Sequence, residues 1–322
     1  MFRDFNIAFA KKHIKLRRIR PLTFQRQGVA YVLSKSARLI PHAAGNIEID
    51  ITPVVEYGER RIKEIKASSG KLTPEQLTTM ALHKNLSAFY LKTISHVIYH
   101  VPCLNGFLEW TPFRNGGIFY EAEDINLGFT VHTKRGVMTP GMRNAHHKDI
   151  FSIANEMRDL TRKARRTDMN ELYRRCARKY LGLAARELDP SSFSIGFLYL
   201  KSMLWPEPID PELLEVPVEQ RLQPEEVVGF TSVVANIGSA VKGWQTVTVV
   251  PHPSVFMWGL GHTRILPRYI NGQLMPRHCM NVCVSFDHRA LDGGDIFPFA
   301  DYMRDYVDHP EKIFEWKPGD PI

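Results

Sequence analysis

The stretch Ser285-Phe286-Asp287-His288-Arg289-Ala290-Leu291-Asp292-Gly293-Gly294-Asp295 continues the apolar run Asn281-Val282-Cys283-Val284. Residues 281–286 have the length and composition of a buried strand, so His288 is presented just after a strand end, where functional residues are common. An imidazole suits a general base because its ordinary pKa lies near neutral pH. Asp292 follows four residues later, and Gly293 permits a tight turn beside it. His288 is therefore a candidate catalytic residue, although a lone histidine is more often a structural residue with its hydrogen bonds satisfied, and the pattern alone leaves both interpretations open.

Helix and strand signals follow one another irregularly along the chain. Capping residues predict helix starts at Thr52-Pro53, at Thr73-Pro74 and after Asp149. Further helices are expected over 24–37 and 86–99, and strands over 46–52, 127–133, 227–234, 246–250 and 281–286. Because there is neither an internal repeat nor a regular alternation of strand and helix, this order predicts an α+β layered fold.

Composition narrows the class of protein. Hydrophobic residues at 44% and charged residues at 24% exclude disorder or coiled coil as the main architecture. No apolar run approaches the ~20 residues that span a bilayer, so a cytoplasmic protein is expected. The net charge of +8 favours acidic partners, although a solvated basic face explains the clusters at 11–20 and 162–186 more simply. No module or aromatic interleaving accompanies them, so nucleic acid is not an expected partner.

The sequence predicts no metal site. Cys103, Cys176, Cys279 and Cys283 have no metal-binding or redox spacing, and we expect reduced, packed thiols. His146 and His147 are adjacent, but no carboxylate or cysteine cluster accompanies them, so we interpret them as part of an exposed turn rather than as metal ligands.

Residues 285–295 resemble the signature of the catalytic domain of 2-oxo acid dehydrogenase acyltransferases, the dihydrolipoamide acyltransferase cores of such complexes. Chloramphenicol acetyltransferases and peptide-synthetase condensation domains share this fold but usually have a double histidine where this chain has Asp287-His288. The similarity extends over most of the chain and includes Arg26 and the segments 40–42, 47–52, 102–106, 126–140 and 149–165. It implies a chloramphenicol acetyltransferase-like two-layer sandwich of mixed β-sheet and helices, with a largely helical insertion.

The resemblance also implies an activity and its residues. His288 would deprotonate the thiol of coenzyme A, or of dihydrolipoamide in reverse, for attack on an acyl thioester; a hydroxyl or an amine is an alternative acceptor. Asp292 would pair with a basic side chain, Arg26 above all, and hold the loop of His288. Asp287, Arg289 and Gly293 would support that loop. The family implies a homotrimer, or a larger assembly built from trimers, with active sites between subunits.

One departure from the family pattern concerns the oxyanion. The family has a serine before Asn-Leu-Gly, and the matching run here is Ala235-Asn236-Ile237-Gly238. Losing one oxyanion donor typically costs ~10²–10³ in rate. Ser232, Asn236 and Ser239 mark the region that would supply a substitute, with Thr231 or a backbone amide as further alternatives. The competing hypothesis is a catalytically silent oligomeric core or scaffold protein.

The second departure is modular. We expect a basic N-terminal arm over 1–20 and a catalytic domain over 21–322, interrupted by an insertion at about 167–226. Twenty residues are too few for a lipoyl or a peripheral-subunit-binding domain, so the predicted acyl donor is acyl-CoA or lipoamide on a separate carrier protein. The insertion combines a helical apolar stripe from Met169 with a dense apolar patch at 193–205. It is either a helical hairpin packed on the core or on a neighbouring subunit, or a docking surface for an anionic membrane or a hydrophobic acyl donor.

Overall fold

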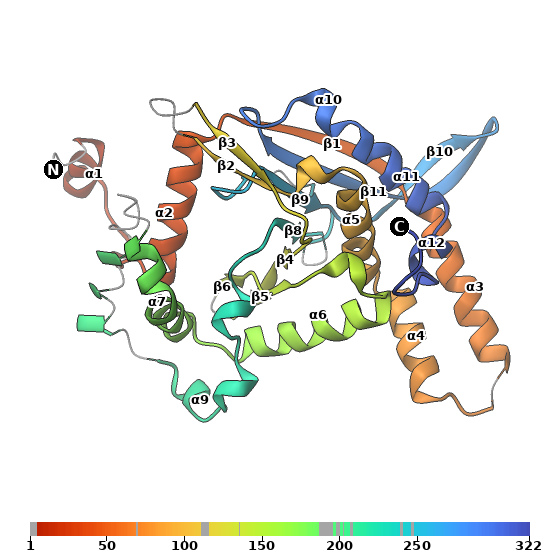
Figure 1. Ribbon diagram of the computed structural model, residues 1–322, viewed down its shortest axis with the longest axis horizontal. Coiled ribbons are helices and arrows are strands. Elements are labelled where there is room, and N and C mark those ends of the chain that lie inside the picture. The colour runs from red at the N-terminus through yellow and green to blue at the C-terminus, as the bar shows by residue number, and fades with distance from the viewer. Residues whose placement is uncertain are drawn as a thin grey trace.

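A computed structural model describes residues 5–68, 70–110, 116–134, 136–186, 196–197, 200–201, 203–206, 209–238, 241–245 and 248–322. A mixed sheet runs through the molecule, and helices cover the face toward which its apolar side chains point (Figure 1). None of the described helices combines the length and the apolar character that crossing a membrane requires. The α+β class predicted from the sequence is confirmed.

The main sheet has the strand order β1-β11-β9-β8-β4-β7, and β10 pairs with the first half of β11. Its strands are β1 (His42–Asp50), β4 (Leu127–Phe129), β7 (Gly141–Met142), β8 (Ser232–Asn236), β9 (Phe256–Leu260), β10 (Arg264–Ile270) and β11 (Gln273–Asp287). The neighbours β9, β8 and β4 run parallel, and the other pairs are antiparallel. Two separate ribbons pair β2 (Gly106–Glu109) with β3 (Ile118–Glu121) and β5 (Val131–Thr133) with β6 (Gly136–Met138). The long strand β11 lies between β1 and β9 and ends at the residue before His288.

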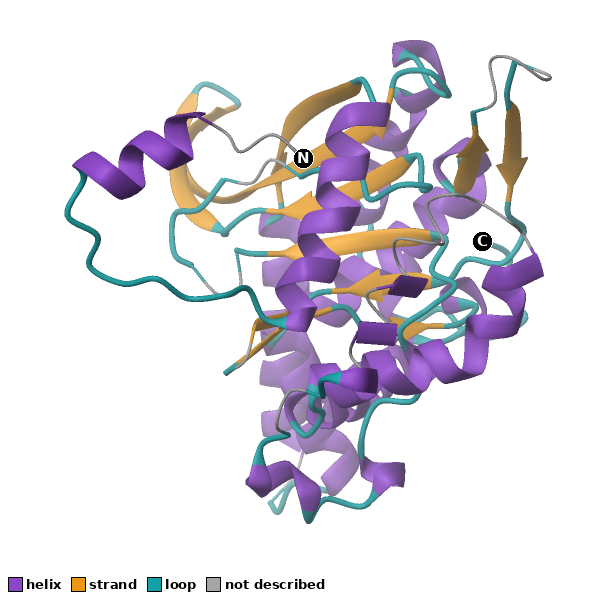
Figure 2. Cartoon of the chain, turned by 90° about the vertical axis from the view of Figure 1, so that its left-hand side faces the viewer, coloured by secondary structure: helices purple, strands orange, loops and turns teal. Residues whose placement is uncertain are grey.

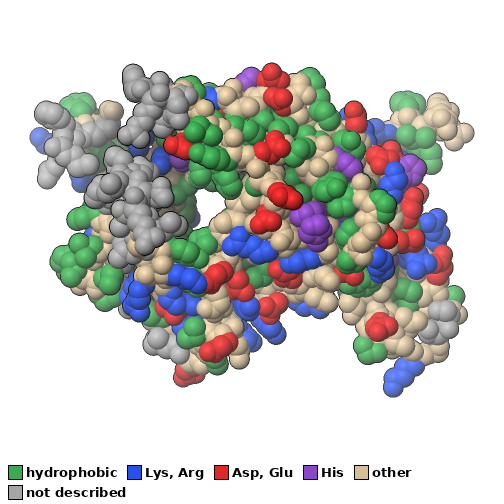
Figure 3. Space-filling view, in the orientation of Figure 1, with side chains coloured by type: hydrophobic (Ala, Val, Ile, Leu, Met, Phe, Trp, Pro, Cys, Tyr) green, Lys and Arg blue, Asp and Glu red, His purple; other side chains and the backbone are tan. Residues whose placement is uncertain are grey.

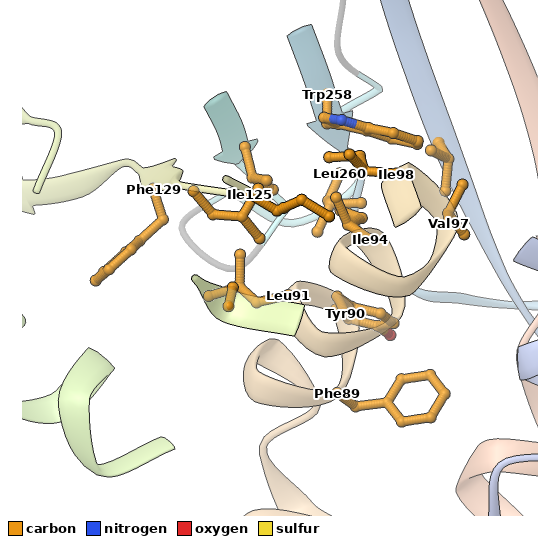
Figure 4. Close-up of a cluster of buried hydrophobic side chains, with 14 of the residues drawn as sticks. Phe89, Tyr90, Leu91, Ile94, Val97, Ile98, Ile125, Phe129, Trp258 and Leu260 are labelled. Carbon is orange, nitrogen blue, oxygen red and sulfur yellow. The ribbon is translucent and has the colours of Figure 1, made fainter. Parts of the chain in front are cut away.

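The helix α5 (Ser87–His100) packs against the sheet at the centre of the molecule and is buried from Ala88 to Ile98. Figure 4 shows its Ile94 and Ile98 beside Trp258 and Leu260 of β9. Around α5 lie α6 (Ile150–Arg165), α11 (Pro298–Asp308) and α12 (Glu311–Phe314), and α3 (Thr52–Ser68) packs on α4 (Pro74–Lys84) and α11. Short turns of helix occupy Pro102–Leu104, Ala145–His147, Val218–Gln220, Pro224–Glu226 and α10 (Gly293–Ile296). This layer holds β11 rigidly from one side.

The helix α2 (Phe24–Leu39) stands apart from that layer, at the left of Figure 1. Its C-terminal end joins the body through the Ser36 hydroxyl, which accepts a hydrogen bond from the backbone of His252 at 2.9 Å. The segment predicted as an N-terminal arm contains α1 (Phe5–His13), a helix without a buried residue. The segment predicted as an insertion contains α7 (Met169–Arg186), a helix that its apolar stripe indicates, and α9 (Pro211–Leu214). Figure 2 shows this end of the molecule face-on.

Local signals located the helices accurately. Thr23, Thr73 and Asp149 cap α2, α4 and α6, and a full capping box joins Thr73 to Gln76. The strand boundaries were less accurate. The predicted strand 127–133 is divided into β4 and β5, and the strand predicted over 227–234 is β8, which begins at Ser232. Residues 248–250 form no strand, and 246–247 lie outside the described residues. Of the apolar patch at 193–205, only 196–197, 200–201 and 203–205 are described.

Candidate active site

His288 is the first residue after β11. Its backbone N–H donates to the carbonyl of Pro41 at 3.1 Å, which ties it to the residue before β1. The side chain is exposed, and its ring centroid lies 5.5 Å from that of Phe286. The imidazole therefore lies next to Phe286 on an exposed residue, a placement that suits contact with a substrate from solvent.

A buried ion pair flanks His288 on both sides in the sequence. Arg289 donates to both carboxylate oxygens of Asp287, from Nε at 2.9 Å and from Nη2 at 2.6 Å. Its backbone N–H adds a third bond to the same carboxylate at 3.0 Å. Asp287 is 1% exposed, so the fork is shielded from water. A bidentate pair of this kind fixes geometry as well as charge, and here it fixes the turn that carries His288.

The carboxylate of Asp292 caps the short helix α10. Its Oδ1 accepts from the backbone of Gly294 at 2.7 Å and of Asp295 at 3.3 Å, and the Asp295 side chain accepts from the backbone of Asp292 at 2.8 Å. At Gly293 a Cβ would lie 2.9 Å from the ring of Phe297, so glycine suits the position. The start of α10, just after the turn of His288, is thus held by hydrogen bonds from backbone N–H groups to the carboxylates of Asp292 and Asp295.

The predicted ion pair between Arg26 and Asp292 does not form within the described part of the subunit. Arg26 is exposed near the start of α2, where its backbone N–H donates to Thr23. Within the described subunit, the Asp292 carboxylate instead accepts hydrogen bonds locally, at the N-terminus of α10. Spacing in the sequence could not distinguish a capping aspartate from a paired one.

Of the predicted oxyanion residues, Ser232 and Asn236 lie on the same face of β8, and Ser239 is not among the described residues. Ser232 and Asn236 lie two residues before and after Val234, a core residue, so all three share one face of the strand and point toward the helices. The Asn236 side chain donates to the Ser87 hydroxyl at 3.5 Å. Ser232 is fully buried.

Ala235 points toward the opposite face of the sheet. Strand pairing places it opposite Gly259, which in turn is opposite Cys283 on β11. Asp287 is four residues beyond Cys283 on the same strand and lies on the same face. Neither Ser232 nor Asn236 lies on that face, so neither side chain occupies the place that the hydroxyl of a serine at position 235 would have.

Two neighbours of the site were missed by the sequence interpretation. The ring of Trp110 lies 5.7 Å from the guanidinium carbon of Arg289, and Trp110 is 48% exposed. Pro41 supplies the carbonyl that holds the backbone of His288. No local signal could identify either residue, because each contact joins segments far apart in the sequence.

Metal ligation finds no support among the side chains that the structure describes. No group of three histidine, cysteine, aspartate or glutamate residues there could hold an ion. The four cysteines are free, and burial raises the pKa of the Cys176, Cys279 and Cys283 thiols.

The fold and sequence can be compared with known proteins. The family model of the 2-oxoacid dehydrogenases acyltransferase (catalytic domain) matches residues 15–172 and 212–315. The dihydrolipoyllysine-residue acetyltransferase component of the pyruvate dehydrogenase complex of Staphylococcus aureus is 23% identical over 290 residues, covering 89% of this chain and 51% of that protein. The Bacillus subtilis counterpart is 23% identical over 297 residues, covering 89% and 49%. The chain therefore spans about half the length of these curated relatives.

Solved structures agree on the fold. The dihydrolipoamide acetyltransferase of Azotobacter vinelandii superimposes with a TM-score of 0.65 at 18% identity, covering 97% of this chain and 98% of that one. The cubic core of a pyruvate dehydrogenase multienzyme complex gives 0.64 at 17% identity, with the same coverage. The two segments matched by the family model make up most of the 322 residues, and the chain belongs to the family of 2-oxoacid dehydrogenase acyltransferase catalytic domains.

Proposed function

We propose that the protein transfers an acyl group between a coenzyme A thioester and an acceptor, with His288 as the general base. The observation that carries this proposal is the placement of His288: an exposed imidazole on a turn fixed by the Asp287–Arg289 pair and by Pro41. Membership of the acyltransferase family supports it. A thiol is the favoured acceptor, and a hydroxyl or an amine is the alternative.

The proposed step is a proton-coupled thioester exchange. In the direction that consumes free coenzyme A, a ring nitrogen of His288 takes the thiol proton, and the sulfur attacks the acyl carbonyl carbon. The tetrahedral intermediate then collapses, the bond to the original thiol breaks, and the departing sulfur takes the proton back from the imidazolium. The acyl group changes carrier, and no oxidant or reductant is consumed.

The proposal also covers the acyl donor and the assembly of subunits. The donor would be acyl-CoA or lipoamide on a separate protein, and the chain would form a homotrimer or a larger assembly of trimers. The cubic core that this chain resembles in fold supports an oligomer of high symmetry. A peripheral membrane contact of the insertion remains a prediction; Phe197 and Trp205 in its described part are 68% and 70% exposed.

A scaffold without catalysis is the second candidate, and Ala235 favours it. The Azotobacter structure was solved in a study of a serine, a histidine and an asparagine in the catalytic mechanism of that enzyme, with the asparagine four positions after the histidine. In this chain Asp292 stands four positions after His288, and alanine stands where we expect the serine. A backbone amide would then have to stabilise the oxyanion.

The experiment is a measurement of coenzyme A release from a panel of acyl-CoAs in the presence of thiol, hydroxyl and amine acceptors. We expect turnover by the native chain and a loss of about 10²–10⁴-fold in His288→Ala, the range that a general base contributes. His132→Ala, which removes an exposed histidine on β5, is the matched control and should behave as native. Absence of turnover with every donor and acceptor would favour the scaffold.

A further inference from the structure

A cavity of about 510 Å³ lies away from His288, where α5 meets α11, α12 and the last residues of the chain. In Figure 1, α11, α12 and the C-terminal end of the chain lie to the right of α5, which α11 and α12 contact. The residues that line the cavity include His96, His100, Tyr302, Asp305, Tyr306 and Trp316. A volume of this size accommodates a small organic ligand. Neither His288 nor any residue of its turn is part of the lining.

One wall contains a buried imidazole without a partner. His96 on α5 is 1% exposed, and among the described residues its Nε2 has no hydrogen-bond partner. Burial, together with the charge of Lys92 and of two neighbouring histidines, lowers the pKa of His96 to about 2, so the ring is neutral. A buried polar atom left unsatisfied destabilises a protein, and in a native structure it calls for an explanation. A neutral imidazole nitrogen can accept a hydrogen bond from an N–H group of a ligand.

Aromatic rings form much of the remaining wall. The centroid of His96 lies 5.6 Å from that of Tyr306 and 5.2 Å from that of Trp316, both edge to face. His100 stacks on Tyr302 at 4.4 Å and shares a hydrogen bond of 3.0 Å with the Tyr306 hydroxyl. These contacts hold the rings in place without a ligand. The Trp316 ring already has a cation, the ammonium group of Lys92 at 3.4 Å from its centroid, so the rings offer a ligand apolar surface rather than a further cation site.

The charge of the cavity is opposite to that of the protein. Asp305, Glu311, Glu315 and Asp320 line it together with one cation, Lys312, although the chain as a whole carries a net charge of +8. Lys312 pairs with Asp305 at 2.8 Å. Glu311 lies 3.5 Å from the His309 ring, and Glu315 accepts a hydrogen bond from the Tyr57 hydroxyl at 2.8 Å. Asp320 accepts one from the backbone of Lys317 at 2.8 Å. None of these three carboxylates forms an ion pair with a lysine or arginine side chain among the described contacts. The lining therefore selects against anions and favours a positively charged ligand.

We propose that this cavity binds an aliphatic primary amine in its ammonium form, with the N–H groups directed to His96 Nε2 and to the carboxylates, and with the alkyl chain against the tyrosine and tryptophan rings. A primary ammonium offers three donors, which suits a wall that combines an imidazole acceptor with carboxylates. The site is independent of the acyltransferase chemistry, and its occupation requires no participation of His288.

The test is titration calorimetry of the full chain with n-hexylammonium at about 150 mM salt, the physiological ionic strength. This salt screens weak, non-specific attraction to the protein surface. We expect saturable one-to-one binding of hexylammonium, none of 1-hexanol, and weaker binding of hexyltrimethylammonium, which has no N–H donor. The double variant Glu311→Gln/Glu315→Gln should lower the affinity about tenfold or more, since each change removes a carboxylate charge and keeps the side-chain shape. Asp308→Asn, an exposed acid on α11 outside the lining, is the matched control and should bind as native.

A second variant separates binding from folding. His96→Phe keeps an aromatic ring against Tyr306 and Trp316 but removes the unsatisfied nitrogen. We expect a melting temperature higher by roughly 2 °C or more, together with the loss of hexylammonium binding. The proposal is overturned if hexylammonium binding to the native chain does not saturate, or if 1-hexanol binds equally well. It is also overturned if hexylammonium binding is unchanged in both His96→Phe and the double variant.

Discussion

Arg289 and Asp287 hold the turn of His288 with a pair that is nearly closed to solvent. Removing one partner of such a pair leaves an uncompensated charge in the interior, which is more costly than the loss of the contact itself. The carboxylate of Asp287 would be left with only the backbone bond from residue 289. The pair therefore matters most for the integrity of the turn.

We expect Arg289→Ala to lower the free energy of unfolding by about 3–5 kcal/mol, as measured by urea denaturation. Arg289→Lys keeps the charge but loses the planar fork, and it should fall between the native chain and the alanine variant. The double variant Asp287→Asn/Arg289→Ala should recover part of the loss, because no buried charge remains. A single alanine variant within about 1 kcal/mol of native would show that the pair contributes little.

Lys92 on α5 is a buried cation that forms no ion pair among the described contacts, and the charge of Asp149 only partly offsets the effect of its burial on its pKa. Its Nζ donates to the carbonyl of His146 at 2.8 Å and lies 3.4 Å from the ring centroid of Trp316. Burial lowers the pKa of Lys92 to about 7 from the ordinary 10.5. Between these two values the unfolded chain binds more protons than the folded one, so the contribution of Lys92 to stability rises with pH above about 7.

We expect Lys92→Met to remove this dependence. The difference in unfolding free energy between the native chain and the variant should be constant below pH 7 and should then shift in favour of the native chain, by up to about 1.4 kcal/mol per pH unit. Urea denaturation from about pH 5.5 to about pH 9, in steps of about half a pH unit, measures this difference in unfolding free energy. Parallel curves across the whole range would contradict a proton linked to Lys92.

At the scale of the element, Asp292 serves as the cap of α10, immediately after the turn of His288. Asparagine caps a helix about as well as aspartate, whereas alanine loses about 0.5–2 kcal/mol. We expect Asp292→Asn to retain both stability and coenzyme A release, and Asp292→Ala to lose both in part. The measurement is a thermal melt alongside the acyl-CoA assay. Equal loss of activity in the two variants would assign the role to the negative charge instead, as a salt bridge would require.

The elements that the sequence predicted well are those whose signals are local. Capping at Thr73 and Asp149 and the apolar periodicity of α5 need only neighbours within a turn of helix. Strands depend on partners elsewhere in the chain. The apolar run at 281–286 is only the buried half of β11, and the first half pairs with β10 and is largely exposed, so its alternation gives no hydrophobic signal. β9 was not predicted at all, although it lies at the centre of the sheet.

In the candidate site, too, contacts between neighbouring residues could be predicted from the sequence, and contacts between distant segments could not. His288, Asp287 and Arg289 are contiguous, and the structure brings them together on one turn. The pairing of Arg26 with Asp292 needed knowledge of the relative positions of α2 and α10, which no sequence pattern contains. Whether Ala235 is compensated also depends on packing around β8, where Ser232 and Asn236 point to the opposite face from Ala235.

At the scale of the whole molecule, the ribbon of β10 and the first half of β11 projects beyond the rest of the sheet (Figure 1). Strand pairing places Ile265, Tyr269 and Leu274 on one face of it, and they are 66%, 76% and 62% exposed. Figure 3 shows hydrophobic side chains at this projecting end. Large apolar side chains gathered on one exposed face are typical of surfaces that another chain covers.

The proposed assembly therefore has a direct test. Light scattering should give three times the chain mass, or a multiple of that value, for the native protein. Tyr269→Asp should shift the distribution to smaller species, because a charge on the apolar face of the ribbon opposes its burial. Tyr120→Asp, on the separate ribbon of β2 and β3, provides a control at a half-exposed tyrosine. A native chain that is monomeric at all concentrations would contradict the trimer.

The central claim is that His288 moves the proton in acyl transfer, and chemical rescue tests it most directly. Because the ring is exposed at the end of β11, added imidazole can enter the space that His288→Ala leaves. We predict that turnover of this variant, lowered about 10²–10⁴-fold, rises with imidazole concentration while the native rate does not. His132→Ala should show no response to imidazole. If His288→Ala releases coenzyme A at the native rate, His288 is not the base.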